Sequence, residues 1–249
     1  MNIPDVYVDS TRFIIDYGKV SCASNQKTSG GKLACASLLK PLYMWSAAHL
    51  EPYKYEEEKW LKLAEQATTT SSNNATNAIW DSLGAATILH KLNELTQAEY
   101  TTSSSLTYGS VKVNSTMVAH SYASLLMASA HDTPAAKIVA WMKQVKSDQT
   151  FGLRDEIDIF YSGLLIGVGV KCGWYVDQAD CRLRTHAVIF AELDASTTLG
   201  FVILTSVLVT RCIVNDYLSE YETGQEVLGI HEKISGKLLR EELRALLNK

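Results

Sequence analysis

The sequence predicts an α/β fold of the α+β kind, with an antiparallel sheet built from both chain ends, flanked by helices, plus an all-helical lobe. Strand-like alternation near the N-terminus, amphipathic stretches in the middle and apolar strand-like runs from residue 164 onwards predict this order. The 249 residues, 47% of them hydrophobic, suffice for one domain of two lobes. We expect an α/β lobe from residues 1–35 and 162–249, and a helical lobe from residues 36–161.

Local patterns place the elements of the first half of the chain. Two apolar stretches flank a turn at Tyr17, Gly18 and Lys19, and Pro52 breaks the chain between two helical patterns. Gly84 separates two further helices. The expected elements are two short strands within 5–22, a polar loop at 23–33, and helices at 37–50, 56–68, 75–83 and 85–95.

The second half is expected to return from helices to strands. Asp132 or Thr133 caps a helix that Pro134 opens, and three apolar runs in series favour an antiparallel meander. Residues 98–115 are rich in Thr, Ser and Tyr and indicate no clear element. The expected elements are helices at 117–130 and 134–145, strands at 164–171, 185–193 and 199–209, a polar connection at 217–224, and an amphipathic helix at 226–248 that would kink at Gly236.

A Ser-x-x-Lys motif stands where the polar run gives way to the first helix. Residues three apart share one helix face, so Ser37 and Lys40 can meet there. A serine hydroxyl needs a base to become a good nucleophile, and a lysine can be that base when burial lowers its pKa. The helix N-terminus adds N–H groups that can hold an oxyanion. The simpler alternative is a helix-capping serine beside a solvated lysine.

Two more motifs follow in order. Ser71-Ser72-Asn73 precedes a helix, and Lys171-Cys172-Gly173-Trp174 ends an apolar strand. Ser-x-x-Lys, Ser-x-Asn and Lys-Thr-Gly is the motif set of class A β-lactamases and penicillin-binding proteins. From residue 33 to 205 the chain resembles this superfamily, and it looks most like the small serine hydrolases of the group.

The resemblance implies a role for each motif residue. Ser37 would be the acylated nucleophile, Lys40 its base, Ser71 a proton relay, and Lys171 a positive charge for a substrate carboxylate. The backbone N–H groups of Ser37 and Trp174 would form the oxyanion hole. The residues expected to bind substrate are Asn73, Cys172, Gly173, Trp174 and Arg184.

The motifs depart from the family pattern in two places. Cys172 stands where the family has a threonine, and a thiol is a weak donor, so carboxylate-bearing β-lactams are expected to bind poorly. Arg182 or Arg184 could compensate for that loss. Ser72-x-Asn74 fits the second motif as well as Ser71-x-Asn73 does, which leaves the register open.

The glutamate that class A enzymes use for deacylation has no clear counterpart. Glu99 lies in the right part of the chain and Glu156 lies near the third motif, but neither has the family's context. Hydrolysis of an acyl-enzyme should then be slow or should use Lys40 or Ser71. The expected function is therefore a serine hydrolase or acyltransferase with a Ser37 acyl-enzyme, acting on an amide or ester but not as an efficient β-lactamase.

Two other functions stay open. The same fold could serve a non-hydrolytic cyclisation or isomerisation in cytosolic small-molecule biosynthesis. A non-catalytic binding protein is disfavoured, because binding alone does not need this set of serines and lysines. Cys35 is a weak candidate nucleophile, since no base is paired with it.

Composition excludes several partners. Because the chain has a net charge of −4 and no basic stripe, we do not expect nucleic acid as a partner. No apolar run is long enough for a membrane helix. The six histidines lack metal-ligand spacing, so neither metal nor cofactor is expected. Five scattered cysteines and the lack of a signal-like N-terminus favour the cytoplasm. The expected partner is a small-molecule or peptide-like substrate, and nothing indicates the oligomeric state.

Overall fold

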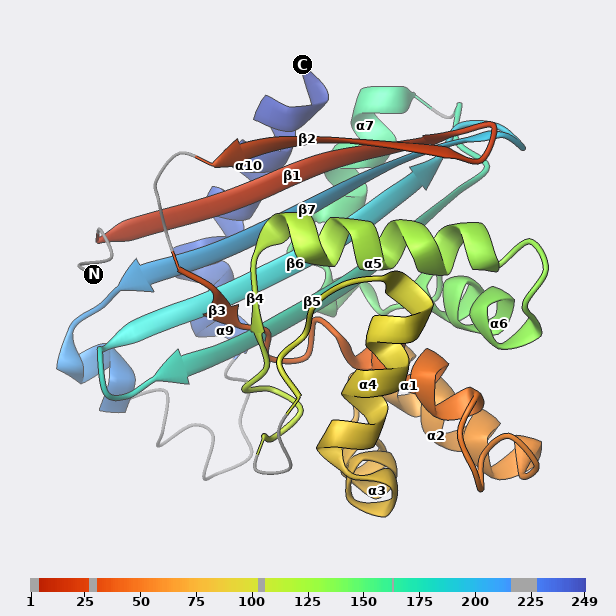
Figure 1. The fold of residues 1–249 in the computed structure, drawn as a ribbon. Coiled ribbons are helices and arrows are strands. Elements are labelled where there is room, and N and C mark those ends of the chain that lie inside the picture. Colours follow the sequence, from red (N-terminus) through yellow and green to blue (C-terminus); the bar gives the residue numbers. More distant parts are fainter. Residues whose placement is uncertain (1–4, 27–30, 103–105, 163, 216–227) are drawn as a thin grey trace.

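A five-stranded antiparallel sheet of order β2-β1-β7-β6-β5 organises the chain (Figure 1). The computed structural model describes residues 5–26, 31–102, 106–162, 164–215 and 228–249. Two strands come from the N-terminal part of the chain and three from the C-terminal part, so the prediction of a sheet from both ends is confirmed. The strands are β1 (Val6–Asp16), β2 (Lys19–Gln26), β5 (Gly167–Asp177), β6 (Arg182–Glu192) and β7 (Thr197–Leu208).

A row of alternating phenylalanines and glycines crosses four of these strands. Phe13 pairs with Gly200, Gly200 with Phe190, and Phe190 with Gly169. A Cβ atom at Gly200 would lie 1.9 Å from the Phe13 ring, and one at Gly169 would lie 2.2 Å from the Phe190 ring. The glycines therefore make room for two fully buried rings, and a one-residue slip would turn both rings to the wrong face.

Helices from the middle of the chain cover one face of the sheet (Figure 1). Helix α5 packs directly on β1, β2 and β7, and the other helices pack around α1 and α5. Their apolar sides share one core with Phe13 and Phe190. The helices are α1 (Lys40–Ala48), α2 (Glu57–Thr69), α3 (Asn73–Leu83), α4 (Ala85–Thr96), α5 (Ser115–Ala128) and α6 (Thr133–Met142).

The opposite face carries a second apolar core that includes Ile189, Phe201 and Leu243. It is covered by α7 (Leu153–Tyr161) and α10 (Lys237–Leu247). The C-terminal helical segment passes without a break from α9 (Leu228–His231) through a π-helical turn, η2 (Glu232–Gly236), into α10. Residues 226 and 227 and the expected connection at 217–224 lie outside the described residues.

Helix α7 was not anticipated from the sequence. It falls within the predicted helical lobe, yet it packs against α10 and β5 rather than against the other helices. The lobe boundaries at residues 35/36 and 161/162 stay predictions. A short 3-10 helix, η1 (Ser147–Gln149), precedes α7.

A two-stranded ribbon of β3 (Leu33–Ala34) and β4 (Lys112–Val113) lies just before the first motif. Its second strand falls in the region where the sequence indicated no element. Helix α1 begins at Lys40 instead of Ser37, because residues 36–39 form a turn. This ribbon and turn position the site.

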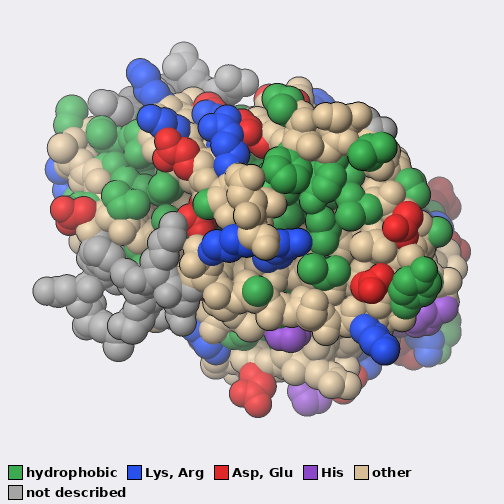
Figure 2. All heavy atoms as spheres, turned by 90° about the horizontal axis from the view of Figure 1, so that it is seen from above, with side chains coloured by type: hydrophobic (Ala, Val, Ile, Leu, Met, Phe, Trp, Pro, Cys, Tyr) green, Lys and Arg blue, Asp and Glu red, His purple; other side chains and the backbone are tan. Residues whose placement is uncertain are grey.

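The face of the molecule on the side of β2, α7 and α10 carries both hydrophobic and basic side chains. Figure 2 shows this face from above, with hydrophobic side chains grouped beside lysines and arginines. Exposed large hydrophobic residues include Ile159 and Phe160 of α7 and Leu164 and Ile166 before β5. Cys22, Cys35, Cys172 and Cys181 are free thiols. Within the described ranges, no helix is both long and apolar enough to cross a membrane.

Candidate active site

Ser37 lies in the tight turn between β3 and α1. The preceding residue, Ala36, has a φ of 51°, a left-handed conformation that costs a non-glycine residue on the order of 1 kcal/mol. The turn is held by the Leu38 N–H, which donates to the Cys35 carbonyl at 3.1 Å, and by Tyr122 Oη, which donates to the Leu38 carbonyl at 2.5 Å. The fold therefore imposes this local strain immediately beside the half-buried Ser37.

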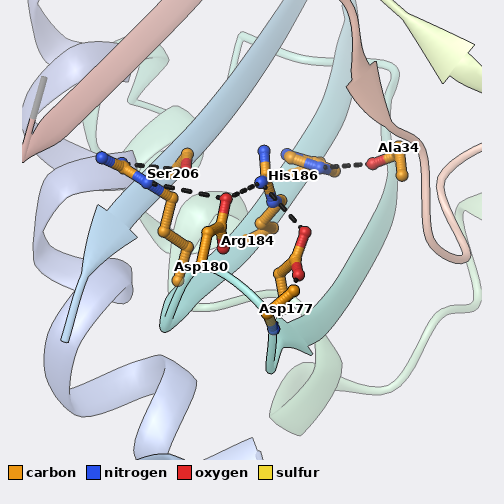
Figure 3. A network of polar contacts seen from close by, with 8 residues as sticks. Ala34, Asp177, Asp180, Arg184, His186 and Ser206 are labelled. Atoms are coloured by element: carbon orange, nitrogen blue, oxygen red, sulfur yellow. Dashed lines mark hydrogen bonds and ion pairs between the residues drawn. The ribbon is translucent and has the colours of Figure 1, made fainter. Parts of the chain in front are cut away.

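His186 of β6 ties the segment before Ser37 to the sheet. Burial lowers the pKa of His186 to about 4, so the ring is neutral at pH 7. Its Nδ1 accepts the N–H of Thr205 at 3.3 Å, and a neutral ring then carries its proton on Nε2. That nitrogen donates to the Ala34 carbonyl at 2.9 Å, which anchors β3 (Figure 3).

Strand β5 passes very close to the Ser37 turn. A Cβ atom at Gly173 would lie 2.6 Å from Leu38 N and 2.7 Å from Ser37 N. These are backbone atoms, so they cannot move aside cheaply, and only glycine fits here. Side chains alternate along a strand, which puts Lys171 on the same face as Gly173.

Lys40 is fully buried, and its amine contacts the loop before α3. Lys40 Nζ donates to the Ser71 carbonyl at 2.5 Å and to Asn73 Oδ1 at 2.7 Å, with Ser71 Oγ at 3.4 Å. Burial, followed by the charge of Lys171, lowers the pKa of Lys40 to about 6. At pH 7 the group is mostly a neutral amine, whose two N–H bonds match the two short contacts and whose lone pair can take a proton.

The same contacts bear on the register of the second motif. Ser72 Oγ accepts the Ala75 N–H at 3.2 Å and caps α3, so its hydroxyl serves the helix. Ser71 has a φ of 56°, another left-handed residue beside Lys40. The geometry favours Ser71 and Asn73 as the motif residues.

A cavity of about 1010 Å³ collects Ser37, Ser71, Asn73 and Trp174 along its wall. Lys40 reaches this wall through its bonds to Ser71 and Asn73. The described structure has no hydrogen bond between Ser37 Oγ and Lys40 Nζ, and such catalytic pairs often tighten only when substrate binds. Lys171 is also buried, which lowers its pKa to about 7, and it lies close enough to affect Lys40.

Two expected substrate contacts are corrected by the structure. The Cys172 thiol packs in the apolar core on the far face of the sheet, because it alternates with Lys171 and Gly173. Arg184 does not line the cavity, since its Nη2 donates to Asp177 Oδ2 at 3.1 Å and to Asp180 Oδ2 at 2.6 Å (Figure 3). Arg182 is likewise engaged, with Nη1 3.4 Å from Ser206 Oγ.

Neither candidate glutamate approaches Lys40. Glu99 is exposed and lines a different cavity of about 1100 Å³, which holds none of the predicted site residues. Glu156 bonds Arg244 of α10 at 2.6 Å. Within the described residues, no carboxylate contacts Lys40, and no group of three or more acidic, His or Cys side chains is placed to hold a metal ion. Burial raises the pKa of the Cys35 thiol to about 12, which disfavours it as a nucleophile.

Tyr108 is a site residue that sequence reasoning missed. Its Oη donates to Asn73 Oδ1 at 2.8 Å, and its ring centre lies 5.1 Å from Lys40 Nζ. Its carbonyl accepts a bond from Tyr43 Oη at 2.9 Å, which holds the segment over the cavity. No motif marks Tyr108 within its Thr/Ser-rich stretch, so only the tertiary structure identifies it.

Solved class A β-lactamases share this architecture. A variant of the last common ancestor of Gram-negative bacteria class A β-lactamase matches with a TM-score of 0.50 and 14% identity, over 82% of this chain and 86% of that one. A class A β-lactamase from Mycobacterium abscessus matches with a TM-score of 0.52 and 12% identity, over 79% and 84%. No protein-family profile and no curated protein matches the sequence. The predicted β-lactamase-like fold is confirmed, and identities this low show the fold alone.

Proposed function

We propose that this chain, which has the fold of class A β-lactamases, is a serine hydrolase or acyltransferase that forms an acyl-enzyme on Ser37. The observation that carries the proposal is the buried Lys40 amine, held against Ser71 and Asn73 beside the cavity that Ser37 lines. Burying a lysine is costly, and a pKa of about 6 provides a base at neutral pH. A purely structural or binding role gives no reason for that cost.

In the proposed acylation, Lys40 takes the Ser37 proton while Oγ attacks the carbonyl carbon of an amide or ester. The N–H groups of Ser37 and Trp174 hold the developing oxyanion. Ser71 passes the proton to the leaving group, so the C–N or C–O bond breaks and the leaving group departs neutral. Asn73 Oδ1 already accepts bonds from Lys40 and Tyr108, which leaves its NH₂ to donate to the substrate.

The second half-reaction is proposed to be slow with water. Class A enzymes use a glutamate for this step, and in the described part of this site the contacts of Lys40 are to Ser71, Asn73 and the Tyr108 ring. An acyl group on Ser37 should therefore persist or pass to an acceptor other than water. This supports a hydrolase of low turnover or an acyltransferase rather than an efficient β-lactamase.

Turnover of nitrophenyl esters and nitroanilides tests this function. We expect Ser37→Ala to lose at least about 1,000-fold of the activity and to keep its unfolding temperature. Ser124→Ala is a matched control, because its exposed hydroxyl bonds only the His120 carbonyl of its own helix. Near-wild-type turnover by Ser37→Ala would contradict the acyl-enzyme and favour a non-covalent cyclisation or isomerisation.

A further inference from the structure

A second cavity, of about 1100 Å³, runs along α5. Among the described residues, it shares no lining residue with the cavity at Ser37. Its α5 residues recur every three or four positions, which marks one face of the helix. The end of α1 and the segment after α4 complete the lining. The lining residues from α5 are Thr116, Met117, His120, Ala123, Ser124, Met127 and Ala128.

Half-buried apolar side chains form part of this lining. They pack with one side against the main core and face the cavity with the other. Two of them are methionines, whose flexible side chains adapt to apolar groups of varied shape. Such a lining suits the apolar body of a small molecule. The residues are Leu95, Ala98, Met117, Met127 and Ala128.

Asp132 supplies a carboxylate at the end of the cavity where α5 leads into α6. It is the N-cap residue of α6, yet its side chain bonds none of the N–H groups of that helix. Instead, Oδ2 accepts Trp45 Nε1 at 2.6 Å and His49 Nε2 at 3.1 Å, both from the end of α1. The Asp132 side chain is only 16% exposed, so two donors hold it in a defined position.

The second carboxylate oxygen of Asp132 is available to a ligand. Within the described part of the chain, Oδ1 accepts no hydrogen bond, and it is not sealed from solvent. An ionised carboxylate can only accept, so a group that binds Oδ1 must offer an N–H or O–H. A charged ammonium makes a stronger bond of this kind than a neutral donor does.

In the described residues, no lysine or arginine pairs with Asp132. Its ion-pair contact is His49, and Lys137 of α6 bonds Glu57 at 2.6 Å instead. Lys32 also lines the cavity, but it precedes β3, and the partner strand β4 leads into the start of α5 (Figure 1). Asp132 follows the end of this 14-residue helix, which is about 21 Å long, so the two charges lie at opposite ends. The remaining ionisable lining residues are Glu99, His120 and His131.

We propose that this cavity is a second binding site, which takes a small molecule with an amine at one end of an apolar body. The amine donates to Asp132 Oδ1, and the body lies against Met127 and Ala128 in the last turn of α5. Trp45 and His49 are positioning residues, because they hold the carboxylate toward the cavity. The site does not depend on the Ser37 chemistry proposed above.

Titrations with phenethylamine, its neutral N-acetyl derivative and phenylpropionate, followed by proton–nitrogen NMR at pH 8, test the proposal. The indole N–H of Trp45 bonds Asp132 and therefore reports on that carboxylate. We expect the amine to shift this resonance and to bind at least about tenfold more tightly than the other two. Asp132→Asn keeps an oxygen for the indole N–H but loses the charge, so it should remove the preference. Asp158→Asn, which removes an exposed carboxylate of α7, should leave it unchanged.

A second variant keeps the test decisive if Asp132→Asn does not fold. Met127→Ser removes apolar contact from a half-buried position and should weaken the amine at least about threefold. Unchanged binding by this variant, a preference that Asp132→Asn retains, or no shift of the Trp45 resonance at millimolar amine overturns the proposal. Tightest binding of phenylpropionate, lost in Lys32→Ala, overturns it as well. Ser37→Ala should bind the amine as the wild type does, which separates this claim from the catalytic one.

Discussion

At the level of single residues, the site contains two buried lysines, Lys40 and Lys171. Burial is the main cause that lowers the pKa of Lys40 to about 6 and of Lys171 to about 7. The charge of Lys171 also lowers the pKa of Lys40. The pair therefore gives the site a base at neutral pH, at a cost in stability that can be measured.

The rate of Ser37 acylation should follow the titration of Lys40. The amine is a base only when neutral, so the rate should rise with pH through about 6 and then level off. Labelling by a fluorophosphonate between pH 4.5 and 9 measures this profile. A rate that still rises at pH 9, as an amine with the ordinary lysine pKa of 10.5 would give, would rule out Lys40 as the base in this form.

Lys171→Met should stabilise the protein at neutral pH. Between pH 7 and 10.5 the unfolded chain binds a proton on Lys171 that the folded chain does not, so stability rises with pH across that window. A methionine of similar length removes this penalty, and we expect a gain of at least about 1 kcal/mol at pH 7.5. Urea unfolding at several pH values measures it, with the exposed Lys237→Met as the control. An equal pH slope in both variants would contradict the burial argument.

Tyr108→Phe isolates one hydrogen bond of the site. The ring stays over Lys40, while the donor to Asn73 Oδ1 is lost. We expect about a tenfold fall in kcat/KM, the equivalent of about 1.4 kcal/mol, with little change in unfolding temperature. Tyr17→Phe, at an 82% exposed side chain, is the matched control. Unchanged kinetics would show that Tyr108 does not position Asn73.

At the level of elements, the close approach of β5 to the backbone of the Ser37 turn constrains the site. Gly173→Ala would place a Cβ atom against two backbone nitrogens, so β5 must move away from the turn. We expect at least about a 100-fold loss of acylation rate and about 1–3 kcal/mol of destabilisation. Gly229→Ala, where a Cβ atom meets open space, should change neither. Full activity of Gly173→Ala would contradict the close approach.

The strands and most helices were predictable because hydrophobic periodicity marks them locally. The Ser37 turn was not, since its left-handed Ala36 depends on bonds from Tyr122 and from the segment before β4. Helix α7 and the β3–β4 ribbon are short, and distant packing decides them. Strand alternation predicts that Cys172 faces away from Lys171, but the sequence does not tell which face holds the site.

At the level of the whole molecule, the order of strands and helices predicts a sheet made from both ends of the chain. Three motifs distant in sequence belong to one site because the edge strand β5 lies against the start of α1, and Lys40 contacts the loop before α3. The pairing of Arg184 with two aspartates was not predictable, because the residues of the β5–β6 turn give no sign of which oxygens face the cavity.

The most direct test of the account is the intact mass of the protein after treatment with a fluorophosphonate and, separately, with a penicillin. We expect one adduct with each reagent, mapped to Ser37 by peptide sequencing and absent from Ser37→Ala. The penicillin adduct should decay slowly, because no described carboxylate contacts Lys40. A folded wild-type protein that gains no adduct from either reagent, or an adduct that persists in Ser37→Ala, would contradict the Ser37 acyl-enzyme.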